Sequence, residues 1–152
     1  MKQLLLIISF LSCFILFGCD NELGADNTNK QDIEVKNISA NNIINQEPSN
    51  KAKELLIKHD AVTGIKAANT TKKLIVAVEI QHSKRFQLKQ IKKKLMKELK
   101  NNFNDYKVEL TIDKKIYLEL EKLEEQIQSQ KIKPDKLKKE IDRITKLSKE
   151  KT

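Results

Sequence analysis

The sequence predicts an α+β fold, in which a small three-stranded sheet with helices on one face is followed by two C-terminal helices. Residues 74–80 are an almost continuous apolar run, with Leu74, Val76, Val78 and Ile80 on one face, and apolar residues alternate with a period of two in 108–112; both patterns are typical of strands. They recur at steps of three and four in 88–103, 116–127 and 137–147, which is typical of amphipathic helices. The predicted order is therefore α-β-β-α-β, and then two further helices.

The first half of this pattern begins with a helix. Ser49 or Asn50 is expected to cap it, because short polar side chains accept hydrogen bonds from the first free backbone N–H groups. A first strand is expected between Val62 and Ala67, with an irregularity at Gly64. A turn and the strongest strand of the chain follow.

In the second half of the pattern, a helix and a strand are again followed by helices. A helix is expected over about 86–102, followed by a third strand that ends at Ile112. Asp113 is expected to cap the next helix, and Pro134 is expected in the first turn of the last one. Four arrangements are open for that last helix: a hairpin with its predecessor, docking on the sheet, pairing with another copy of the chain, or a frayed and solvated tail.

The first eighteen residues differ from the remainder. One Lys precedes an almost wholly apolar run from Leu4 to Phe17, and Gly18 and Cys19 follow. As a helix this run would be about 21 Å long, which is too short for a hydrocarbon core of about 30 Å. The pattern indicates an export signal. An uncleaved anchor and an ordinary secretory signal with incidental cysteines are the alternatives.

The stretch Leu16-Phe17-Gly18-Cys19 resembles the lipobox of bacterial lipoproteins. The resemblance implies that Cys19 receives a diacylglycerol and that residues 1–18 are then removed. Cys13 would leave with the signal, so the mature chain would have one cysteine and no intramolecular disulfide. Acylation explains such an unpaired exported thiol, and two acyl chains give stable anchoring.

Residues 19–48 are rich in Asn and Asp and have few aliphatic side chains, which predicts a flexible tether. A coil of this length spans roughly 30 Å root-mean-square. The expected division of the remainder is a small α/β domain over 49–113 and a C-terminal helical extension over 114–152.

The rhythm of residues 50–128, behind the lipobox, resembles the YhcN/YlaJ family of sporulation lipoproteins of endospore-forming bacteria. The resemblance rests on "AKELLIKHDAVTGIKAANTTKKLIVAVEI", a Lys-rich amphipathic helix and "VELTIDKKIYLELEKLEEQI". The helix-strand-strand-helix-strand order is also similar to the BON domain of bacterial envelope proteins. The resemblance implies a lipoprotein on the outer face of the cell membrane or the spore inner membrane. It implies a role in sporulation or germination, exerted by binding another envelope component.

The sequence contains no motif for catalysis, a metal or a cofactor, so we expect a non-enzymatic protein that needs none. His59-Asp60 and His82 lack a third group to orient them, and zinc needs three or four ligands. The glycines are too few for a phosphate loop. An acidic cluster is interpreted as a solvated helix face: Glu121, Glu124 and Glu125.

Positive charge is concentrated in residues 84–100, which carry eight basic residues and one acidic residue, or +7. Without residues 1–18 the chain has 29 basic and 21 acidic residues, or +8, so this segment holds nearly all of the excess. We expect it to bind the anionic headgroups of a membrane. The alternative is a soluble helix that is merely rich in lysine. Nucleic acid is not expected, because aromatic residues are not interleaved with the charges. The predicted surface comprises Lys84, Arg85, Lys89, Lys93, Lys94, Lys97 and Lys100.

Overall fold

The computed structural model describes residue 37 and residues 44–150. The predicted signal, Cys19 and most of the predicted tether lie outside the described residues. Residues 44–48, which were assigned to the tether, lie in the folded part, and two of them are in the first helix.

The fold class predicted from the sequence is confirmed, because a three-stranded sheet and four α-helices follow one another in the expected order. The elements are α2 (Glu47–Leu56), β1 (Val62–Asn69), β2 (Lys73–Ile80), the 3₁₀ helix η2 (His82–Gln87), α3 (Leu88–Asn102), β3 (Lys107–Thr111), α4 (Lys114–Gln128) and α5 (Pro134–Glu150).

Strand β2 is the centre of the sheet. It pairs antiparallel with β1 through a short turn and parallel with β3, which the chain reaches by crossing over through η2 and α3. The pairing of β1 with β2 shifts register between Val62 and Gly64, which confirms the irregularity expected at Gly64.

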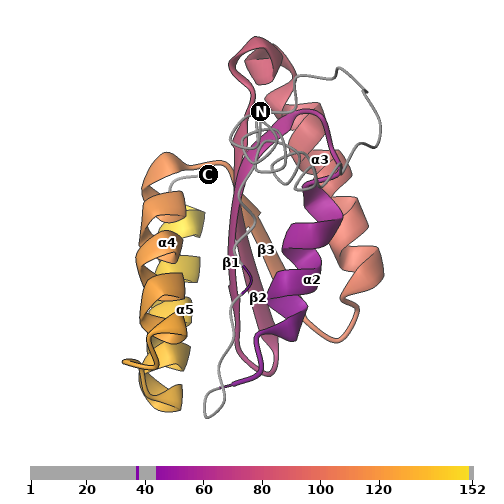
Figure 1. The fold of residues 1–152 in the computed structure, drawn as a ribbon. Helices are drawn as coiled ribbons and strands as arrows, with labels where there is room; N and C mark the ends of the chain where they lie inside the picture. Colours follow the sequence, from indigo (N-terminus) through magenta and orange to yellow (C-terminus); the bar gives the residue numbers. More distant parts are fainter. Residues whose placement is uncertain (1–36, 38–43, 151–152) are drawn as a thin grey trace, which may run out of the picture.

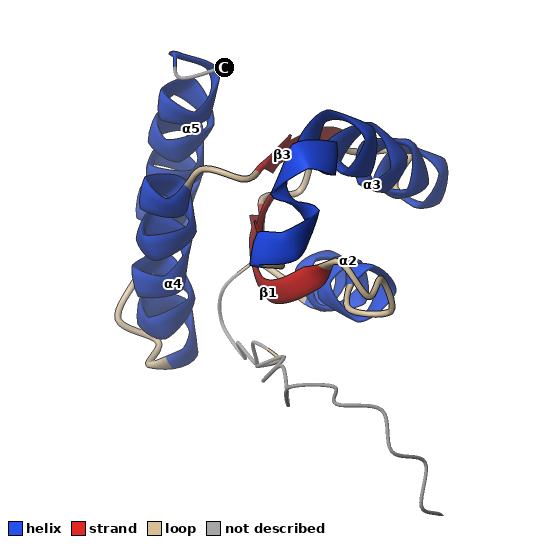
Figure 2. Ribbon diagram, turned by 90° about the horizontal axis from the view of Figure 1, so that it is seen from above, coloured by secondary structure: helices blue, strands red, loops and turns tan. Residues whose placement is uncertain are grey.

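Helices cover both faces of the sheet (Figures 1 and 2). Helices α2 and α3 pack on one face around a core that includes Leu56, Leu95 and Leu99. The hairpin of α4 and α5 packs on the other face around a second core that includes Leu120 and Ile141. The sequence predicted helices on one face only for the first part of the fold. The structure decides the position of the last helix, which packs against α4 and reaches β2.

The predicted cap of the first helix is wrong. Helix α2 begins at Glu47, two residues before Ser49, and Pro48 occupies its first turn. Gln46 stands at the N-cap position, but its side chain makes no capping hydrogen bond. The side chains of Gln46 and Ser49 instead form hydrogen bonds with Asn69, at the end of the edge strand β1.

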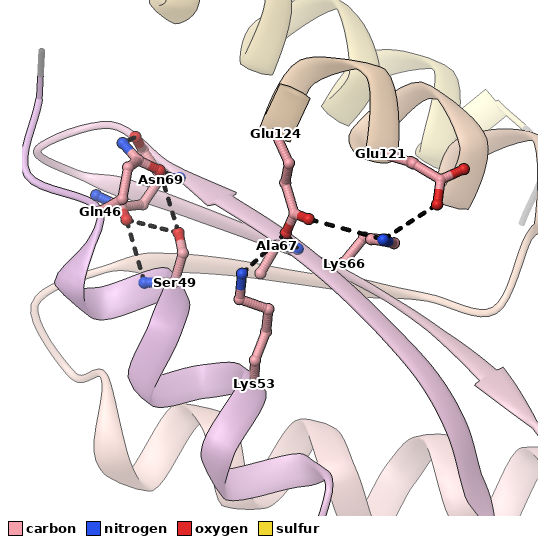
Figure 3. Close-up of polar contacts among 8 residues, drawn as sticks. All are labelled: Gln46, Ser49, Lys53, Lys66, Ala67, Asn69, Glu121 and Glu124. Carbon is pink, nitrogen blue, oxygen red and sulfur yellow. Dashed lines mark hydrogen bonds and ion pairs between the residues drawn. The ribbon is translucent and has the colours of Figure 1, made fainter. Parts of the chain in front are cut away.

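Strand β1 is an edge strand whose free side is closed by side chains (Figure 3). The amide of Gln46 donates to the carbonyl of Asn69 at 2.9 Å and accepts its N–H at 3.0 Å, as a neighbouring strand would. Two residues along, a carboxylate oxygen of Glu124 accepts the N–H of Ala67 at 2.9 Å. These contacts satisfy buried backbone groups and block pairing with another strand there.

The helices that follow the sheet, α4 and α5, begin where the sequence predicted. The Asp113 carboxylate accepts the N–H of Ile116 at 3.0 Å, which confirms it as the cap of α4, and α5 begins at Pro134 as expected. The helix expected from residue 86 differs, because α3 starts at Leu88 and Phe86 lies in the preceding 3₁₀ turn.

Candidate anionic-surface site

Helix α3 turns its charged side outward because its apolar stripe is fixed against the sheet. Leu95 and Leu99 are fully buried, and Phe103 at the end of the helix is nearly so. At about 100° per residue, Lys93 and Lys97 fall on the opposite side of the helix from this stripe. The packing of the core therefore determines which way the lysines point.

The seven basic residues predicted from the sequence are all exposed. Lys92, which falls within the apolar arc, is half-buried. Within the described residues, no ion pair involves any basic residue from 84 to 100. Their charge is thus directed at solvent and is available to an external anion. We call this surface the basic face, and it comprises Lys84, Arg85, Lys89, Lys93, Lys94, Lys97 and Lys100.

Glu98, the one acidic residue in this segment, is engaged within the fold. Its Oε2 lies 2.5 Å from Nε2 of His59, which follows the C-terminal end of α2. Both side chains are partly buried where α2 and α3 meet. The sequence suggested no partner for His59, because Glu98 is 39 residues away. The contact joins the two helices and draws the carboxylate toward α2.

Phe86 is a feature that the sequence reasoning placed wrongly. Its side chain is 82% exposed in η2, beside the exposed Lys84 and Arg85. A signal was present in the sequence: in a continuous helix Phe86 would lie about 160° from Leu88, on the polar side of the stripe. The structure therefore adds an aromatic ring to the start of the basic face.

A cavity of about 450 Å³ lies between η2 and the neighbouring ends of the strands. Val78, Leu88 and Ile112 contribute apolar surface to it, and Arg85 and Lys114 contribute cationic groups. Lys114 also pairs with Glu79, which lines the same cavity. The Glu79 carboxylate therefore compensates part of the positive charge in the lining of the cavity.

The acidic cluster on α4 was interpreted as a solvated face, and this is wrong for Glu124. That side chain is buried, and its Oε1 lies 3.1 Å from Nζ of Lys53, which is itself fully buried. Lys53 comes from α2 and Glu124 from α4, so the pair joins the two helical layers beside β1 (Figure 3). Burial raises the pKa of the Glu124 carboxyl and lowers the pKa of the Lys53 ammonium.

A second polar contact joins β1 to α4. Nζ of Lys66 lies 3.1 Å from Oε1 of Glu121 and 5.8 Å from the ring centroid of Tyr117. Burial, together with Glu79 and Glu121, raises the pKa of the Tyr117 hydroxyl to about 12. These groups are used in packing one layer on the sheet and lie apart from the basic face.

The remaining predictions concern metal binding, the membrane and the lipidation of Cys19. His82 is exposed in η2, and among the described residues no set of three or more His, Cys, Asp or Glu side chains is placed to hold a metal ion. None of the described helices combines the length and apolarity needed to cross a bilayer. Cys19 lies outside the described residues, so its lipidation stays a prediction.

Comparisons with protein-family models, with curated proteins and with solved structures returned no match for this chain. The resemblance to the sporulation lipoproteins therefore stays a prediction from the sequence.

Proposed function

We propose that this chain is a membrane-tethered, non-enzymatic protein whose basic face binds anionic lipid headgroups. One observation carries the proposal: seven exposed basic side chains on η2 and α3 have no ion-pair partner among the described residues. A lipid-anchored domain has an anionic bilayer as its nearest polyanion. A positively charged surface held there is electrostatically complementary to it.

The expected free energies favour contact between the basic face and an anionic bilayer. Each Lys near an anionic leaflet contributes about 1 kcal/mol, and the attraction falls off over a Debye length of about 8 Å. Lys89, Lys93, Lys97 and Lys100 lie within about 80° of one another around the helix, so they can approach a plane together. Four such contacts outweigh the entropic cost of drawing a roughly 30 Å tether toward the surface.

The test is charge reversal with a matched control. The variant K93E/K94E/K97E changes three exposed lysines of the basic face and should lose binding to anionic vesicles by more than about 100-fold, about 3 kcal/mol. The control K136E/K138E/K139E makes the same change in net charge on exposed lysines of α5 and should bind almost normally. Cosedimentation of the unacylated chain with vesicles, at several salt concentrations, measures both.

Two results would contradict the proposal. Binding of the wild-type chain that depends neither on anionic lipid nor on salt would remove the electrostatic basis. Equal losses in the two triple variants would show that net charge alone matters and that the basic face has no special role.

A second proposal rests on the lipobox and on the rhythm of residues 50–128. It assigns the chain to sporulation or germination in an endospore-forming bacterium, where it would act on another envelope component from the outer face of the membrane. The wild-type protein should partition into a detergent phase, and Cys19→Ala should not. Crosslinking in spores then seeks the partner, and K93E/K94E/K97E should retain it if the partner binds a different surface.

A further inference from the structure

The exposure of Phe86 is unusual for so apolar a side chain. The structure describes two phenylalanines, and the other, Phe103, is 9% exposed and packs in the core beside α3. Phe86 is 82% exposed and lies on a 3₁₀ helix none of whose residues is buried. Leaving this ring in water forgoes most of the free energy that burial of a phenylalanine provides.

The position of the ring relates it to the basic face. Turn η2 directly precedes α3 and lies beyond the end of the sheet, where it forms the upper end of the fold in Figure 1. Lys84 and Arg85 precede Phe86 and Lys89 follows it, and all three are exposed. An aromatic ring thus stands at the outer end of a cationic surface, within a turn that has no acidic residue.

This combination matches the chemistry of a membrane interface. In interfacial membrane-binding segments, phenylalanine side chains enter the boundary between headgroups and acyl chains, and neighbouring lysines and arginines extend their charged ends toward lipid phosphates. A nucleic-acid ligand would need further rings for stacking, and Phe86 is the one phenylalanine, tyrosine or tryptophan in η2 and α3. Binding of a protein partner usually needs an extended exposed apolar patch. Among the described residues, the Phe86 ring has no other large exposed apolar side chain beside it, so a protein partner is less well matched than a bilayer.

We propose that Phe86 inserts into the interfacial region of an anionic bilayer and fixes the orientation of the domain on it. The inference rests on the proposed function, since the basic face brings the domain to the surface. It adds an apolar point of contact to an electrostatic one. The η2 end of the fold then faces the lipid, and α3 lies against the headgroups with its N-terminal end deepest.

The chain has no tryptophan, so F86W introduces a single indole, whose emission can be excited selectively over that of the two tyrosines, at the position in question. The full chain is reconstituted into vesicles of phosphatidylcholine, with or without phosphatidylglycerol. With the anionic lipid, the indole emission of F86W should shift to shorter wavelength and should be quenched by lipids brominated on their acyl chains. L118W places the fluorophore on α4, at the other large apolar residue that is exposed within the described part of the chain, and its emission should neither shift nor be quenched.

The contribution of the ring is measured with F86A. Because Phe86 makes little contact with the fold, the variant should unfold at the same urea concentration as the wild type. The ratio of docked to undocked protein on anionic vesicles should fall about tenfold. Hydrogen exchange of the 82–88 amides reports that ratio, and L118A should leave it unchanged.

The two proposals fail in distinguishable ways. If binding depends on anionic lipid and salt but the indole of F86W stays accessible to an aqueous quencher, insertion is wrong and the headgroup proposal stands. If binding shows no such dependence, both are wrong. Equal acyl-chain quenching of the F86W and L118W proteins would also overturn the proposal, because it would show no defined orientation.

Discussion

Helices α3 and α5 are both amphipathic and rich in lysine, yet their charges have different surroundings. Helix α3 carries six lysines and one glutamate, and its lysines form no ion pair with any residue that the structure describes. Helix α5 carries six basic and four acidic residues, and three of the basic ones meet carboxylates. Arg143 alone contacts Glu119 and Glu140 at 2.5 and 2.8 Å.

The difference shows why composition alone is a poor guide to a binding surface. The Glu119 and Glu140 contacts raise the pKa of Arg143, and Arg143 lowers the pKa of Glu119. Half of the basic side chains on α5 therefore form ion pairs with carboxylates of the same chain. On α3 the lysines repel one another and remain available. The layer of α4 and α5 is therefore expected to be the structural one, and the layer of α2 and α3 the one that meets a partner.

The largest predicted effect lies where the two layers meet. Lys53→Met should lower the free energy of unfolding by about 3–5 kcal/mol, because it takes away the ammonium nearest a buried carboxylate. Glu124→Gln should cost a similar amount. The double variant K53M/E124Q should recover most of the loss, since the glutamine oxygen still accepts the Ala67 N–H. Urea unfolding of all four proteins gives the coupling energy, and additive losses would contradict the prediction.

The pH dependence of K53M follows from the raised pKa of Glu124. A carboxyl whose pKa is raised in the folded state binds its proton more tightly there than in the unfolded chain. Its contribution to stability is full below the ordinary Glu pKa and is lost as the pH rises through the folded value. K53M should therefore regain stability between neutral and mildly acidic pH, whereas K53M/E124Q should show no such gain.

A smaller effect is expected where β1 meets the α4 layer. A Cβ at Gly64 would lie 2.7 Å from the hydroxyl oxygen of Tyr117 and 2.9 Å from Oε2 of Glu79. Gly64→Ala should cost about 1–3 kcal/mol, because the ring must shift within its packing. Adding Tyr117→Phe removes the nearest atom and should restore part of the stability. Thermal unfolding decides this, and a G64A protein as stable as the wild type would show that the Tyr117 and Glu79 side chains shift away at no cost.

The pairs on α5 are predicted to matter less. Arg143→Gln removes contacts to Glu119 and Glu140, which are partly exposed, so the loss should be no more than about 1 kcal/mol. The loss should shrink at high salt, because exposed ion pairs are screened. A salt-independent loss would mean that Arg143 acts through packing of its side-chain stem.

The smallest effect has the opposite sign and distinguishes α3 from α5. Lys93 has Lys89 and Lys97 four residues away on either side, so Lys93→Gln should raise stability by about 0.5 kcal/mol. Lys138→Gln on α5 should give no gain, because Asp142 lies four residues on. Denaturant unfolding at low salt measures both. Loss of stability in K93Q would mean that its charge has a partner within the fold.

Periodicity and local chemistry were sufficient to predict the fold class and the outward side of α3. The cap at Asp113 and the start of α5 at Pro134 depend on residues within one turn of each other, so the sequence contains the whole signal. The apolar run from Leu74 to Val78 also indicated a strand covered on both faces, which the one-sided prediction overlooked.

The contacts that were missed join residues distant in the chain. Lys53 and Glu124 are separated by 71 residues, and Gln46 and Asn69 by 23. Each of these residues, taken alone, is expected at a surface, because polar side chains are buried only with partners. Pattern analysis of one element cannot supply a partner on another. The lysines of α3 were found because they need no internal partner.

The closing of the β1 edge by Gln46 also fixes where the chain enters the fold. Gln46 lies beside Asn69, at the opposite end of an eight-residue strand from η2, a separation of about 26 Å. An acyl group on Cys19 and the ring of Phe86 would therefore attach the domain to the bilayer from opposite ends of its long axis. If the intervening chain of about 25 residues is the tether that its composition predicts, its coil length would be roughly 28 Å, which is close to that span. Halving this linker would reduce the predicted coil length to roughly 19 Å, so the chain would have to stretch, and contact of the far end with the lipid should become less favourable without being prevented.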